Sequence, residues 1–279
     1  MNTVYSLMDA LLPLDALRFT FMKNAFLAVL LLTPLLGLLG TMAVNHQMAF
    51  FSDALGHSAI TGIGLGILLG LHNDLLAMLI FGIIWAILIC VIKQSGSASV
   101  DTVISVFSST SIAAGLLILA RGGKFAKYSS LLIGDILAVT PGDLAALAVA
   151  LPAGVLLWAL LYNQLLLTSV SPSLARSRGI HTRLVECAFV VLVAVAVMLA
   201  IRWVGVLLIN ALLILPAAAG RNLARNSRQH AVFSVLIALI SGLSGLFLAY
   251  AQDTSAGASI VLVAAACYAL SLLLRNWRK

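Results

Sequence analysis

Two ionisable residues, Asp53 and His57, stand four apart in the segment FFSDALGHSA (residues 50–59). If this segment is helical, that spacing places both side chains on one helix face. A carboxylate oxygen beside an imidazole nitrogen suits a borderline divalent ion such as Zn²⁺ or Mn²⁺. Since no thiolate accompanies them, such a pair favours release of the ion over storage. A hydrogen bond between the two side chains, satisfying two buried polar groups, explains the same spacing, so spacing alone leaves both interpretations open.

Other polar side chains in apolar surroundings give weaker indications. Glu186 is interpreted as an interfacial charge near Arg183. Asp135 is interpreted as a helix cap or turn residue, with the lining of an outer vestibule as the alternative. The other histidines are interpreted as ordinary loop or span-mouth residues: His46, His72, His181 and His230.

The sequence also argues against two kinds of enzyme, a rhomboid-type protease and an ATPase. The segment GLSG (residues 242–245) matches the Gly-x-Ser-Gly of rhomboid proteases, but no histidine follows His230 to complete a dyad on a later helix. The phosphate loop Gly-x-x-x-x-Gly-Lys-Ser/Thr is absent from the sequence. If ATP powers this protein, a separate subunit must bind the nucleotide.

The composition describes the environment of these residues. Of 279 residues, 62% are hydrophobic and 9% charged, and the mean hydropathy is +1.14. A soluble domain has about 25% charged residues, so soluble enzymes, disordered proteins and coiled coils are excluded. The net charge of +7 sits in loops and fits the positive-inside rule, which gives no reason to expect nucleic acid as a partner.

The hydropathy pattern predicts an all-α, multi-pass membrane protein of about nine spans, with eight to ten possible. The expected spans are about 20–42, 49–70, 75–93, 101–120, 143–162, 184–201, 203–220, 231–250 and 256–274. A very tight hairpin joins the sixth and seventh at Arg202, and the apolar piece 129–139 is too short to cross. Residues 1–19 form an interfacial helix, and residues 20–279 form a single transmembrane domain. The basic residues favour an outside N-terminus and a cytoplasmic 171–183 loop.

Small residues and cysteines have structural interpretations. Gly62, Gly66 and Gly70 recur every four residues, which predicts a face for close helix packing. The cysteines lie in apolar runs without close pairing and are interpreted as small apolar fillers: Cys90, Cys187 and Cys267.

Four segments together resemble one known family. SDALGHSA (52–59), followed by the glycine stripe, resembles the second-helix motif of the zinc/manganese ABC-importer permeases, the ABC-3 family. DTVI (101–104), LIGDIL (132–137) and VGVLLINALLILPA (204–217) match further family segments in order. The resemblance covers residues 20 to 274, and it implies that Asp53 and His57 are metal ligands in the translocation path.

The resemblance also implies the rest of the machine. The fold is expected to be that of the type II, vitamin B12-type, ABC importer permeases in a bacterial inner membrane. Two copies of the permease pair in the lipid, two ATP-binding subunits dock below, and an extracytoplasmic metal-binding protein delivers the ion. No cofactor is permanently bound, because the metal is the cargo. By its place before the metal motif, His46 is expected to help at the inner exit.

The basic loop 171–183 looks like the family's ATPase-coupling helix. Pro172 can start a short helix and Gly179 can end it. Leu174 and Arg178 then share one face, as apolar anchor and charged contact, while Arg176 points elsewhere and mainly orients the loop. The family usually has acidic residues where this chain has Ser171 and Ser173.

The sequence therefore predicts a non-enzymatic permease subunit of an ABC importer for Zn²⁺ or Mn²⁺. The alternative is a stand-alone secondary transporter or channel that uses Asp53 and His57 as a proton or metal relay. The basic loop favours the ABC importer, since a secondary carrier has no ATPase to contact.

Overall fold

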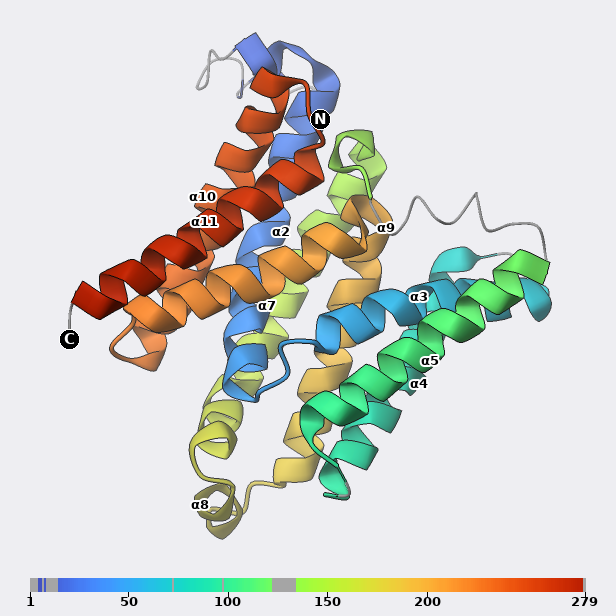
Figure 1. Cartoon of the computed structure of the whole chain (residues 1–279), viewed down its shortest axis with the longest axis vertical. Helices are drawn as coiled ribbons and strands as arrows, with labels where there is room; N and C mark the ends of the chain where they lie inside the picture. The colour runs from blue at the N-terminus through green and yellow to red at the C-terminus, as the bar shows by residue number, and fades with distance from the viewer. Residues whose placement is uncertain are drawn as a thin grey trace. The chain divides into compact units, whose positions relative to one another are not determined.

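The computed structural model describes residues 5–6, 8, 15–71, 73–96, 98–121 and 134–277, and its regular secondary structure in these ranges is entirely helical. The elements, labelled in Figure 1 where there is room, are η1 (Asp15–Arg18), α2 (Thr20–Asn45), α3 (Phe51–Leu68), α4 (Asp74–Gln94), α5 (Val100–Arg121), η2 (Ile136–Ala138), α7 (Pro141–Val170), α8 (Pro172–Ser177), α9 (Thr182–Leu223), α10 (Ser227–Gln252) and α11 (Ala256–Trp277). The interfacial helix predicted over 1–19 falls largely outside the described residues. Within it, the structure describes residues 5–6 and 8, which are helical, and the 3-10 turn η1.

Apolar helices of membrane-spanning length dominate the described residues. Seven qualify by length and hydropathy, namely α2, α4, α5, α7, α9, α10 and α11. The predicted second span corresponds to α3, which has 18 residues. The 42-residue α9 consists of two helices across a kink and covers the sixth and seventh predicted spans. Each of the nine predicted spans thus coincides with a helix, and the all-α multi-pass class is confirmed.

The joint inside α9 is not where the sequence suggested. Gly205, not Arg202, leaves the helical conformation, with φ of 80° and ψ of 168°. A residue with a Cβ rarely adopts this φ, so the break falls at the glycine. A Cβ added to Gly134 would overlap the backbone at Val204 and Gly205, so the chain before η2 lies directly against this break.

The chain divides into two compact units of interleaved segments. One comprises Met1–Thr41, Ile133–Ala153 and Trp203–Lys279, and the other comprises Met42–Leu132 and Gly154–Arg202. We refer to them as the first and second unit. The second unit contains the pair Asp53 and His57, the short helix α8 and the start of α9.

Side-chain hydrogen bonds fix the chain around η2 in the first unit. Asp135 accepts a hydrogen bond from the Leu137 N–H at 3.0 Å and so caps η2, which confirms its predicted capping role. Residues 129–133 of the predicted short apolar piece lie outside the described residues. Asn24 of α2 donates to the Val139 carbonyl at 3.0 Å, and Trp203 donates to Asp143 at 2.9 Å. These bonds tie the chain around η2 to α2 and α9.

In the second unit, α3 packs against both α4 and α5 through small residues. A Cβ on Gly62 would lie 3.0 Å from the Phe81 Cβ, and one on Gly66 would lie 2.5 Å from the Ala77 Cβ. Both neighbours are on α4. On the α5 side, Thr61 donates a hydrogen bond to the Ser111 carbonyl. The backbone of α3 therefore lies close to α4 at these glycines, and this close packing positions Asp53 and His57.

Within the described residues, Gly70 does not share the packing contacts of Gly62 and Gly66. Gly70 follows the last residue of α3 with φ of +71°, and no described atom would lie within 4 Å of an added Cβ. The Leu71 N–H donates to the Gly66 carbonyl at 2.8 Å, as in a glycine-terminated helix end. Gly70 thus ends α3, because glycine tolerates the left-handed backbone conformation.

We expect Gly66→Leu to lower the stability of the purified protein by about 1–3 kcal/mol, as overpacking usually does. Its side chain would push α4 away and displace the helix that carries Asp53 and His57, so metal transport should fall with it. Thermal melting in detergent, with transport measured in parallel, checks both effects. Gly142→Leu is the matched control, because an added Cβ there would meet only Thr140 Oγ1 at 3.7 Å. A Gly66→Leu protein with the melting and transport of Gly142→Leu would contradict the packing role.

Candidate metal site

A tight turn precedes α3, the helix that carries Asp53 and His57. After α2, Gln47 has φ of 56°, and the Met48 N–H donates to the Ala43 carbonyl at 2.8 Å. The Phe51 N–H then donates to the Met48 carbonyl at 3.1 Å, and α3 begins. Asp53 consequently lies in the first turn of α3, where the positive end of the helix dipole stabilises a carboxylate.

Asp53 and His57 come together as their spacing predicts. Asp53 Oδ2 and His57 Nε2 are 3.4 Å apart, and the side chains are 45% and 23% exposed. This separation exceeds the 2.7–3.2 Å typical of a nitrogen–oxygen hydrogen bond. An oxygen and a nitrogen at this distance can both approach one cation, with one side of the pair still accessible. No group of three metal-ligating side chains occurs in the described part of the chain, so these two would bind an ion only weakly.

A second polar cluster was missed by the sequence interpretation. Glu186 does not pair with Arg183. Its Oε1 lies 2.5 Å from Lys93 Nζ and 3.7 Å from His46 Nδ1. His46 lies in the turn between α2 and α3, as expected, but its side chain is only 4% exposed and its Nε2 lies 3.2 Å from the Leu165 carbonyl. Lys93 and Glu186 both lie in or beside apolar runs, where an unpaired charge is energetically costly. This is the one feature of the sequence that indicates that they are paired.

His230 also differs from its interpretation as a loop residue. It is buried in α10, and its Nε2 lies 2.9 Å from the Ala217 carbonyl. His181 is exposed in the connection between α8 and α9, as expected, whereas His72 lies outside the described residues.

Two of the three cysteines are not mere fillers. Cys90 of α4 and Cys187 of α9 form a disulfide across 97 residues of sequence, while Cys267 is free. Gln94 donates to Cys90 Sγ at 3.2 Å and to the Arg183 carbonyl at 3.2 Å. The end of α4 and the start of α9 are therefore held together by covalent and polar contacts.

The loop 171–183 contains a short helix, α8. Ser171 caps it by accepting from the Leu174 N–H at 3.3 Å, Pro172 is its first residue, and Gly179 follows it with φ of +77°. Leu174 is 45% exposed. Arg178 is exposed at the C-terminal cap, whereas Arg176 Nε donates to the Pro172 carbonyl of its own helix at 3.3 Å. α8 thus presents an exposed apolar side chain, and an exposed guanidinium follows at its C-terminal cap.

Residues 18–275 of the chain match the ABC 3 transport family. This chain belongs to the ABC 3 transport family. The match includes both units, the Asp53–His57 pair and α8.

Relatives within the ABC 3 family are named for two metals. The chain is 31% identical to the high-affinity zinc uptake system membrane protein ZnuB of Haemophilus influenzae, over 92% of this chain and 99% of that protein. It is 29% identical to the manganese import system permease protein ScaB of Streptococcus parasanguinis, over 92% of this chain and 91% of that protein.

A solved structure supports the fold assignment. The structure of PsaBC from Streptococcus pneumoniae in complex with Fab matches with a TM-score of 0.79 and 28% identity, covering 97% of this chain and 95% of that chain. The predicted type II ABC importer permease fold is confirmed, and this ABC 3 family member is a multi-pass membrane permease.

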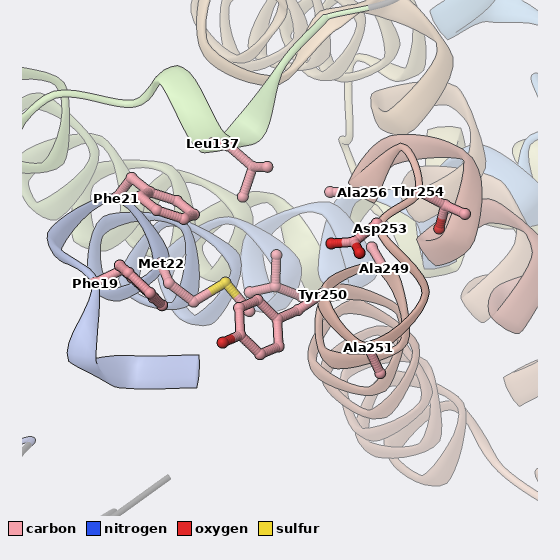
Figure 2. Close-up of a pocket in the computed structure, with 11 residues that line it drawn as sticks. Phe19, Phe21, Met22, Leu137, Ala249, Tyr250, Ala251, Asp253, Thr254 and Ala256 are labelled. Carbon is pink, nitrogen blue, oxygen red and sulfur yellow. The ribbon is translucent and has the colours of Figure 1, made fainter. Parts of the chain in front are cut away.

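The first unit contains a separate cavity of about 660 Å³ between the start of α2, η2 and the α10–α11 connection. Figure 2 shows Phe19, Phe21 and Tyr250 around it, with Asp253 on its wall. Asp253 is the single charged residue of this lining. Neither Asp53 nor His57 contributes to this cavity, and its aromatic rings are typical of a membrane interface.

Proposed function

We propose that this chain is the membrane permease of an ABC importer that carries Zn²⁺ or Mn²⁺ into the cytoplasm of a bacterium. The observation that carries the proposal is the family match over residues 18–275, which contains an adjacent carboxylate and imidazole on α3. The names of the zinc and manganese relatives support the class of cargo. Asp53 and His57 act as a waypoint for the ion in the membrane.

The remaining parts of the transporter are proposed from the same family membership. A separate ATP-binding subunit supplies the energy and docks on α8, through Leu174 and Arg178. An extracytoplasmic metal-binding protein delivers the ion, and a second copy of the permease completes the path. Two ligands per chain are too few for stable zinc coordination, so the partner permease, backbone carbonyls or water must supply the others. Weak binding suits a transporter, which has to let the ion go.

We expect proteoliposomes that contain the permease and its ATPase to accumulate radioactive zinc or manganese only when ATP is present. Competition among zinc, manganese and iron in the same vesicles then assigns the preferred ion. Vesicles with the permease alone, with and without an imposed proton gradient, are the control. Metal uptake by the permease alone would instead identify a secondary transporter, and uptake of none of the three metals would reject the proposal.

A further inference from the structure

Three ionisable side chains from separate elements converge in the second unit. His46 follows α2, Lys93 is in the last turn of α4, and Glu186 is near the start of α9. Their side chains are only 4%, 13% and 16% exposed. Buried charges in a membrane protein are costly and usually mark a pathway or a site. The proposed waypoint at Asp53 and His57 does not use any of the three.

The hydrogen bond of His46 determines which of its nitrogens can bind an ion. The Leu165 carbonyl oxygen can only accept, so His46 Nε2, 3.2 Å away, donates to it. In the neutral ring, Nδ1 then has a free lone pair. Histidines that bind metals commonly donate the other ring N–H to a backbone carbonyl, which fixes the tautomer and the ring orientation. His46 is therefore oriented as a metal ligand through Nδ1.

The atom that His46 Nδ1 faces is also a metal donor. Glu186 Oε1 lies 3.7 Å away, which is too long for a hydrogen bond. Zinc bonds of about 2.0–2.2 Å at a tetrahedral angle bring neighbouring ligand atoms to roughly 3.3–3.6 Å. A small contraction of the pair would therefore place both atoms on one divalent ion.

Lys93 is the cation with which a metal ion would compete for Glu186. Its Nζ is 2.5 Å from Glu186 Oε1 and neutralises the carboxylate. Because Lys93 lies in the last turn of α4, its flexible stem can carry the ammonium outward to the membrane surface. An arriving divalent ion can thus replace Lys93 without leaving a charge buried alone.

We propose that His46 and Glu186 form a second transit site for the divalent metal ion, from which the ion displaces the Lys93 ammonium. This inference rests on the proposed function for the identity of the ion. His46 precedes Asp53 by seven residues across the turn that starts α3, so the two sites are linked through a short rigid segment. With two protein ligands each, both sites hold the ion loosely enough to pass it on.

Equilibrium zinc binding to the purified full-length permease in detergent tests this site without any transport assay. We expect about two zinc ions per wild-type chain, and one per chain in the double variant Asp53→Ala/His57→Ala. In that double-variant background, His46→Gln or Glu186→Gln should weaken the remaining binding at least about tenfold. Lys93→Met in the same background should tighten it about tenfold, since it removes the competing cation. A purely structural role for the cluster does not lead to tighter zinc binding.

His230→Gln is the matched control, because His230 is a buried histidine whose Nε2 also bonds a backbone carbonyl, at 2.9 Å, but whose charged neighbour is Arg221. It should leave zinc binding unchanged. If His46→Gln fails to fold, the Lys93→Met measurement decides, and unchanged or weaker binding there overturns the site. Loss of all zinc binding with Asp53 and His57 overturns the second site but leaves the proposed function intact. A wild-type chain that binds no zinc overturns both.

Discussion

Asp53→Ala and His57→Ala are each expected to abolish metal uptake by the assembled importer while insertion and melting remain near wild type. Neither side chain fills the apolar core, since they are 45% and 23% exposed. Loss of a residue that merely orients a metal ligand lowers affinity about 10–100-fold. Removing one of only two donor groups on α3 should therefore reduce uptake by at least about 100-fold.

Uptake of radioactive zinc and manganese into vesicles with the ATPase measures this effect. Asp74→Asn is the matched control, because Asp74 also lies in the first turn of a helix of the second unit, on α4. It should retain uptake. Near-normal uptake by either alanine variant would remove Asp53 and His57 from the ion path and would favour the hydrogen-bonding interpretation of the pair.

Leu174→Asp is expected to prevent docking of the ATPase and thereby to stop ATP-driven transport. Leu174 is an apolar side chain that is 45% exposed on a capped helix of six residues, outside the long apolar helices. If it fills an apolar groove of the ATPase, an aspartate there loses its hydration without gaining a partner. That desolvation costs several kcal/mol, which corresponds to a loss of affinity of more than about 100-fold.

Co-purification of the ATPase with each permease variant, together with ATP hydrolysis by the complex, checks the docking prediction. Ser173→Asp introduces the same charge one residue earlier, near the start of α8, where a carboxylate is favoured by the helix. It should dock normally. Arg178→Glu should weaken docking and make it more sensitive to salt. If Leu174→Asp retains the full amount of ATPase and transport-coupled hydrolysis, α8 is not the coupling helix, and residues 221–230 become the next candidate.

Features set by neighbouring residues could be predicted from the sequence. Apolar runs of about 20 residues require a helical, multi-pass protein, because backbone groups in lipid must be hydrogen-bonded within the segment. A spacing of four aligns Asp53 with His57 in any α-helix, and they lie together in α3. The caps of η2 and α8 also follow from local chemistry, with Asp135 and Ser171 as acceptors.

The tertiary structure decided which distant segments meet. Glu186 lies 93 residues from Lys93, and Cys187 lies 97 residues from Cys90, so no local pattern indicates that α4 and α9 are neighbours. The glycine stripe looked uniform, but only the path of the chain shows that Gly66 packs on α4 while Gly70 ends α3. Hydropathy identifies an apolar helix but not the face or the partner that it uses, because lipid and protein surroundings favour the same apolar side chains. Local rules therefore produced the helices and the Asp53–His57 pair, whereas the packing of those helices created the His46–Glu186–Lys93 cluster.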